Sequence, residues 1–251
     1  MGSLGLGLAV LLQGCAGLAR EADRPRAPRA VQLEQGSLEV RRGRPGFVIA
    51  APHGTSDRDT HLIGRDLGRL TGWSAVVVTG FSQLDREGRR FNVNRPTESV
   101  PGTPARLETE TEAARAVYET YSRLVAEAAQ GSLRLYVEVH GNGHRDSAGR
   151  VEIATVGIAL ADAQRLKTLL ERMRDARVTG SATPRLEVWV EALDPVRYTA
   201  SAAKRAGMLG ASERALHIEL PKAARTTYRE TYTAVLANFL TRSAPLLTGA
   251  P

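Results

Sequence analysis

Residues 133–144 read LRLYVEVHGNGH, and this stretch decides the fold that we expect for the chain. Apolar side chains alternate with other side chains up to Val139, which is the two-residue period of a β-strand. The run ends at His140, and Gly141 and Gly143 follow. Open α/β sheets build their sites at the carboxyl ends of parallel strands. The stretch therefore predicts a buried strand that delivers His140 to a site.

Strand and helix patterns alternate on both sides of this stretch. Further apolar runs predict strands at residues 46–54, 74–81, 151–159, 186–193 and 215–221. Helical spacing of apolar residues predicts helices at residues 60–70, 108–129, 161–176 and 227–240. Residues 89–96 alternate and stop at a proline, which predicts an edge strand, and the prolines of 97–107 predict a loop. This alternation predicts a three-layer α/β/α fold on a mixed, mostly parallel sheet.

The composition is that of an ordinary globular chain. The 251 residues are 42% hydrophobic and 24% charged, which is enough apolar material for one sizeable domain. The net charge is +7, but no basic run is interleaved with aromatic residues. We therefore expect no nucleic acid as a partner.

The N-terminus has a different character from the rest. Residues 1–15 are apolar and end in LQGC, which resembles the signal segment of bacterial lipoproteins and implies that Cys15 is lipidated. Residues 16–30 are rich in Ala, Arg and Pro and predict a flexible tether, so that residues 31–251 form the single domain. The expected location is the cell envelope, with a membrane anchor at Cys15. If the segment is only an apolar tail, the location is the cytoplasm.

Polar side chains stand at the ends of three predicted strands. His53 follows the first, His140 ends the second, and His217 and Glu219 lie on the third. Two imidazoles and a carboxylate around an open position are the ligand set of a catalytic zinc ion, and a further carboxylate can then handle protons. The alternatives are hydrogen-bonded loop histidines and, for Glu219, a solvated edge strand.

Five short motifs, in this order, strengthen the zinc interpretation. They are residues 52–54 (PHG), 59–62 (DTHL), 91–96 (FNVNRP), 138–141 (EVHG) and 218–220 (IEL). Their order resembles that of the N-formylglutamate amidohydrolases, which are related more distantly to zinc carboxypeptidases and aspartoacylase. The resemblance spans most of residues 46–222. It implies an enzyme with bound Zn²⁺ that hydrolyses C–N amide bonds.

The resemblance also assigns metal ligands. His53 and His140 would hold the zinc ion together with one acid between them. Asp59 matches the family's acid before the helix, and Asp57 competes with it because the loop here is short. The sequence leaves the choice between Asp59 and Asp57 open.

The remaining roles implied by the resemblance concern substrate. Glu219 would be the general base and then the general acid, and Arg95 beside Asn94 would clamp a substrate carboxylate, a task that suits the guanidinium group. An ion pair with an acid on a helix is the alternative for Arg95.

Three departures bear on the substrate. Thr60 replaces the family's Trp, Gly141 replaces its Ser, and Asn92 stands where an Asp is usual. They keep the metal ligands but argue against formylglutamate itself. We therefore expect an amide next to a carboxylate, in an N-acyl amino acid or a peptide. The rival hypothesis is an inactive envelope lipoprotein that uses the same cleft to bind an acidic peptide or amino acid.

Overall fold

The computed structural model describes residues 27–81, 88–103 and 107–249. The predicted signal segment with Cys15 and most of the predicted tether lie outside the described residues. The first strand of the described residues begins at Arg29.

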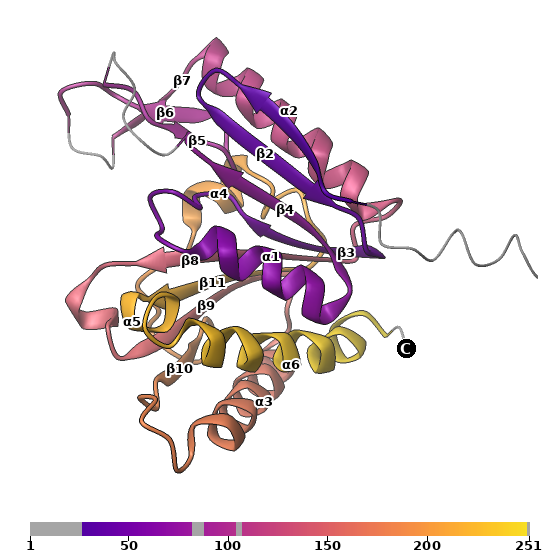
Figure 1. Cartoon of the computed structure of the whole chain (residues 1–251), viewed down its shortest axis with the longest axis vertical. Coiled ribbons are helices and arrows are strands. Elements are labelled where there is room, and N and C mark those ends of the chain that lie inside the picture. The colour runs from indigo at the N-terminus through magenta and orange to yellow at the C-terminus, as the bar shows by residue number, and fades with distance from the viewer. Residues whose placement is uncertain (1–26, 82–87, 104–106, 250–251) are drawn as a thin grey trace, which may run out of the picture.

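A mixed sheet forms the centre of the molecule (Figure 1). Its strands are β1 (Arg29–Leu33), β2 (Gly36–Arg41), β3 (Arg44–Ala51), β4 (Trp73–Thr79), β8 (Leu135–Asn142), β9 (Arg150–Val156), β10 (Glu187–Val190) and β11 (Ala215–Pro221). Their order across the sheet is β1-β2-β4-β3-β8-β11-β9-β10. The pairs from β4 to β11 are parallel, β9 is antiparallel to β11 and parallel to β10, and β1 and β2 are antiparallel additions.

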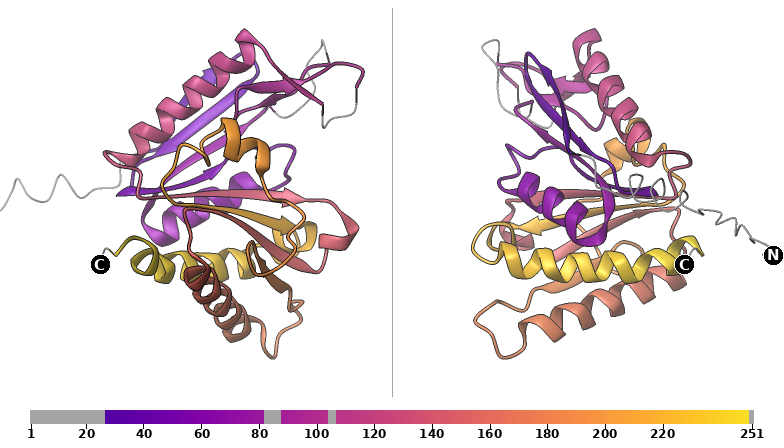
Figure 2. Two further views of the ribbon diagram at one scale, coloured as in Figure 1. Left: turned by 180° about the vertical axis from the view of Figure 1, so that it is seen from behind. Right: turned by 45° about the vertical axis from the view of Figure 1, so that its right-hand side comes forward.

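Helices cover both faces of this sheet, as the two views of Figure 2 show. On one face lie α1 (Thr60–Thr71), α3 (Leu160–Val178) and α6 (Arg229–Thr248), which pack against residues such as Ile49 and Val137. On the other face lies α2 (Glu112–Ala129), packed against Val48 and Tyr136. The predicted three-layer α/β/α fold with a mixed, mostly parallel sheet is confirmed. No helix in the described part of the chain has the length and apolarity needed to cross a bilayer.

The largest differences from the predicted elements lie at the start of the domain and after residue 89. Strands β1 and β2 form a hairpin that the sequence analysis missed. The predicted loop contains β6 (Thr97–Ser99), which pairs with β5 (Phe91–Asn92) and β7 (Glu108–Glu110) in a small second sheet. Helix α2 begins only after Thr111, whose side chain accepts a hydrogen bond from the backbone of Ala114. That N-cap explains why the first residues of the predicted helix are extended.

The register of the central strands positions the polar residues. Strands β3, β8 and β11 are parallel, so their carboxyl ends meet at one edge of the sheet. Glu138 lies opposite His217, and His140 lies opposite Glu219. Side chains two residues apart share a face of the sheet. All four side chains therefore lie on the same face as Tyr136 and Ala215, which is the face that α2 packs against.

Candidate metal centre

Three predicted site residues converge at this edge. Potential ligand atoms of His53, Asp57 and His140 all lie within 4.8 Å of one another. Asp57 Oδ2 is 3.4 Å from Nδ1 of His140 and 3.8 Å from Nδ1 of His53. Two imidazoles and a carboxylate at these separations can hold a metal ion.

Local hydrogen bonds fix the loop that carries Asp57. Its backbone N–H donates to the carbonyl of His53 at 2.8 Å, and its own carbonyl accepts from the Thr60 hydroxyl at 2.8 Å. The backbone N–H of Gly141 donates to Asp57 Oδ2 at 3.1 Å. The carboxylate is thereby held against the end of β8, with His140 beside it.

Asp59 lies outside this arrangement. Among the described residues, it belongs to neither of the groups whose ligand atoms converge. Its backbone adopts the left-handed conformation (φ 68°) at the start of α1, and its carboxylate lies 3.8 Å from Nε of Arg58. Of the two acids that the sequence left open, the geometry favours Asp57 over Asp59.

A buried carboxylate that the sequence analysis did not single out holds the site together. Glu138 has no solvent exposure. Its Oε1 accepts from the Tyr136 hydroxyl at 2.8 Å, and its Oε2 accepts from Asn94 and from Nε2 of His140, each at 3.0 Å. Nδ1 of His217 lies 3.5 Å from the same Oε2. An acid in an otherwise apolar strand, two residues before a candidate ligand, was the available signal.

Glu138, His140 and His217 form a second group whose ligand atoms converge. This group is a poorer candidate for a metal, because Glu138 already accepts hydrogen bonds at both oxygens. A metal there would displace donors from a fully buried carboxylate. Glu138 is instead placed to orient His140 as a metal ligand, because it accepts a hydrogen bond from the ring nitrogen that does not face Asp57.

The protonation states agree with that assignment. Burial, together with the neighbouring His140, lowers the pKa of His53 to about 3, so this imidazole is neutral and has a lone pair to donate. Burial would also lower the pKa of His140, but its hydrogen bonds to Asp57 and Glu138 outweigh burial and raise the pKa to about 10. Burial alone would raise the pKa of Asp57, but the hydrogen bond with His140 and the charges of His53 and His140 outweigh burial and lower this pKa. A metal ion would replace the proton between His140 and Asp57.

Glu219 stands next to this group with one oxygen uncommitted. It is 6% exposed, and its Oε1 lies 3.1 Å from Nε2 of His217. Its Oε2 is buried and has no hydrogen-bond partner among the described residues. The alternative of a solvated edge strand is wrong, because β11 lies between β8 and β9 in the sheet.

The turn between β5 and β6 carries the two predicted substrate-binding residues. Arg95 forms an ion pair with Glu108, whose two carboxylate oxygens accept hydrogen bonds from Nε and Nη2 of the guanidinium. Nη1 of Arg95 donates to Asn94 Oδ1 at 3.2 Å. Asn94 is buried and reaches Glu138 rather than open space. The predicted clamp for a substrate carboxylate is therefore occupied by Glu108 in this structure. An ion pair was the alternative for Arg95, but its acid lies on β7 and not on a helix.

The glycine at position 141 has a packing reason. A Cβ atom there would lie 2.3 Å from the guanidinium carbon of Arg225. That guanidinium is buried and donates to the carbonyls of Leu220, Arg58 and Asn142, which joins the ends of β11 and β8 to the loop before α1. The serine expected from the family pattern would therefore displace the guanidinium of Arg225 from this position.

Comparison with solved structures agrees with this architecture. The fold is similar to that of bacteriophage poly-gamma-glutamate hydrolase, which aligns with 87% of this chain and 93% of its own, with a TM-score of 0.51 at 14% identity. A metallo-carboxypeptidase from Burkholderia cenocepacia aligns over 93% of this chain and 68% of its own (TM-score 0.47, 15% identity). The CwlD amidase from Clostridioides difficile aligns over 81% and 98% (TM-score 0.39, 14% identity).

No protein-family model and no curated protein matches the sequence. The resemblance to N-formylglutamate amidohydrolases therefore stays a prediction.

Proposed function

We propose that this protein is a zinc-dependent hydrolase that cleaves an amide bond next to a carboxylate. The observation that carries the proposal is the group of His53, Asp57 and His140 beside Glu219, whose Oε2 is buried and unpartnered. A site with three ligands and an adjacent free carboxylate fits catalytic zinc, which keeps one coordination position open. We assign the carboxylate ligand to Asp57 in place of Asp59.

The donor set suits zinc. His53 is neutral, its Nε2 has no hydrogen-bond partner among the described residues, and His140 turns Nδ1 toward Asp57 while Nε2 donates to Glu138. A bound zinc ion would act as a Lewis acid toward the substrate carbonyl and acidify water. The chain's own task is to hold these ligands and to move protons.

Glu219 is the residue that we propose moves them. Its Oε2 would take a proton from the attacking water, so that a C–O bond forms at the carbonyl carbon. The same oxygen would then deliver a proton to the leaving nitrogen as the C–N bond breaks. The products are a carboxylic acid and an amine. Burial raises the pKa of Tyr198, and the charge of nearby Glu219 raises it further.

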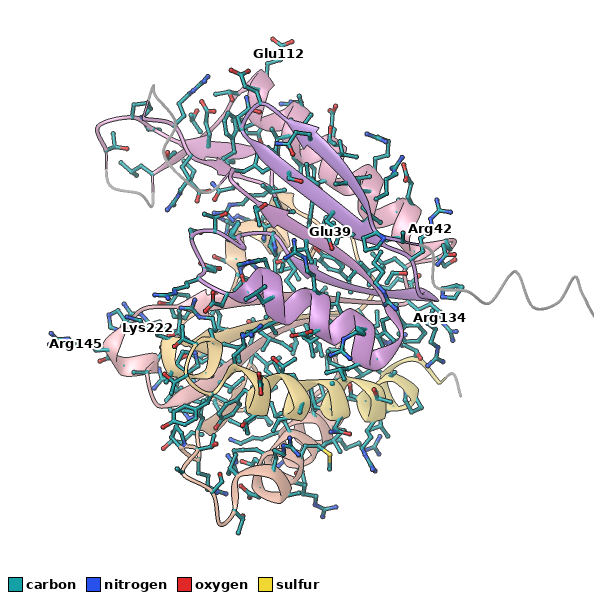
Figure 3. All side chains as sticks on the ribbon, viewed as in Figure 1. Glu39, Arg42, Glu112, Arg134, Arg145 and Lys222 are labelled. Atoms are coloured by element: carbon teal, nitrogen blue, oxygen red, sulfur yellow. The ribbon has the colours of Figure 1, made fainter. Side chains whose placement is uncertain are left out.

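We propose γ-glutamyl amides as the substrate class to test before N-acyl amino acids and peptides. Poly-gamma-glutamate hydrolase shares the fold, and each γ-linked glutamate carries a carboxylate near the scissile amide. Basic side chains near the site favour an anionic substrate. Arg145 and Lys222 are exposed at the end of the sheet where Asn142 of β8 pairs with Pro221 of β11 (Figure 3). Asp146, also exposed, offsets part of that charge.

Two side chains could bind such a substrate, one at its amide and one at its carboxylate. Asn142 lies two residues after His140 on the same face of β8, and both atoms of its carboxamide are buried without a partner among the described residues. A donor and an acceptor side by side match a substrate amide. Arg95 would have to exchange Glu108 for the substrate carboxylate, with Asn94 holding its Nη1.

The first experiment measures zinc content and zinc binding by the full chain beside His140→Ala. We expect about one zinc per chain, lost in the variant, and release of about one proton per zinc near pH 7, because His140 is protonated until the metal binds. As the pH falls, protons compete better and zinc affinity should drop. Calorimetry in two buffers of different ionisation enthalpy counts the proton.

Hydrolysis of γ-glutamyl peptides by the zinc-loaded chain is then measured. Zinc binding without turnover on any amide would favour the rival hypothesis, a lipoprotein that binds an acidic peptide. Absence of zinc binding in both proteins would contradict the proposal altogether.

The location of the protein remains a separate proposal. We propose that it is anchored to the cell envelope through lipidated Cys15, as the LQGC motif predicts. A Cys15→Ser variant should be absent from the membrane fraction of expressing cells. Mass spectrometry should detect the lipid only on the protein that retains Cys15. A Cys15→Ser variant that stays with membranes would contradict the anchor.

A further inference from the structure

The side chain of His217 connects Glu219 to the rest of the site. His217 is 6% exposed and lies on the same face of β11, two residues before Glu219. Its Nε2 is 3.1 Å from Glu219 Oε1, and its Nδ1 is 3.5 Å from Glu138 Oε2. The imidazole thus stands between the two carboxylates.

Glu138 contacts the metal-binding side of the site as well. Its Oε2 accepts from Nε2 of His140 at 3.0 Å, the same oxygen that faces His217. The rings of His140 and His217 also pack on each other, with centroids 4.2 Å apart. One buried carboxylate therefore lies against two imidazoles, one beside the proposed metal and one beside the proposed base.

We propose that His217 is a positioning residue: its Nε2 holds Oε1 of Glu219 so that Oε2 stays free for the reacting water, and Glu138 fixes His217 and His140 in register. This inference rests on the proposed function of Glu219. The unpartnered Oε2 supports it, because buried polar atoms without a partner are uncommon and are often reserved for catalysis.

Side-chain amides separate the two contacts of His217. The amide of Gln reaches the place of Nε2, and the amide of Asn reaches the place of Nδ1. His217→Gln therefore keeps a donor for Glu219, whereas His217→Asn keeps only the contact with Glu138. His217→Ala removes both contacts.

The experiment compares these three variants in the full, zinc-loaded chain on a γ-glutamyl peptide. We expect His217→Ala and His217→Asn to lower kcat on the order of 100-fold with little change in KM, and His217→Gln to stay within about 10-fold of the unaltered chain. Zinc content should be equal in all four proteins. Equal kcat in the Gln and Asn variants, or full activity in His217→Ala, would overturn the inference.

A second readout does not require turnover and separates failure of this inference from failure of the proposed function. In ¹⁵N-histidine spectra, Glu219→Gln should shift the Nε2 resonance of His217 and leave the zinc content unchanged. An unshifted His217 resonance would overturn the positioning role even if the protein is an active hydrolase. A shifted resonance in a protein without activity on any amide would support the contact and contradict the proposed chemistry.

Discussion

Replacing Glu219 by Gln should lower kcat for amide hydrolysis by about 10²- to 10⁴-fold, the range that a general base contributes. The amide has nearly the same shape as the carboxylate but cannot accept the proton of the attacking water. Oε2 of Glu219 is the buried oxygen that has no partner among the described residues and faces no competing donor there. Steady-state kinetics on a γ-glutamyl peptide measure the effect.

Zinc content provides the control for this variant. Glu219 belongs to neither group of converging ligand atoms in the described part of the chain, so Glu219→Gln should bind zinc as the unaltered chain does. Turnover within a few-fold of the unaltered chain would contradict the role of Glu219. Loss of zinc would instead show that this carboxylate helps to hold the metal.

Replacing Glu138 by Gln should weaken zinc binding by about 10- to 100-fold, the usual effect of losing the group that orients a metal-binding imidazole. It should also lower the free energy of unfolding on the order of 3 kcal/mol, because buried donors lose a charged acceptor. Burial alone would raise the pKa of Glu138, but hydrogen bonds from His140 and His217 lower it, so the carboxylate is ionised. Chemical unfolding and zinc titration measure the two effects.

Glu152→Gln is the matched control for Glu138→Gln. Glu152 is also fully buried, and it lies on β9 in register with Glu219. Its hydrogen-bond partners among the described residues are Arg150, Ser147 and the backbone N–H groups of residues 197 and 198, none of them an imidazole. The Glu152→Gln variant should be less stable than the unaltered chain, while its zinc affinity stays within about threefold of the unaltered value. A similar loss of zinc affinity in both variants would mean that the effect of Glu138 is general destabilisation.

Much of the sheet and of the site followed from local patterns. Apolar runs made β3 and β4 recognisable, since buried parallel strands have apolar residues on both faces. Apolar residues that recur between single polar ones made β8, β9 and β11 recognisable. The hairpin of β1 and β2 escaped detection because its residues are mostly polar or half-buried and pair antiparallel at the sheet edge. The small sheet of β5, β6 and β7 depends on pairing between short segments, which no local period reveals.

The sequence by itself determined that the chain forms an α/β domain and that His53, His140 and Glu219 end up at strand ends, because strand periods and breaks are local properties. Only the tertiary structure decided that Asp57 rather than Asp59 joins the imidazoles, that Arg95 pairs with Glu108, and that Glu138 contacts both His140 and His217. These outcomes depend on strand order and register, which bring together residues far apart in the chain. Contacts of that kind are set by packing across the sheet rather than by any spacing along the sequence.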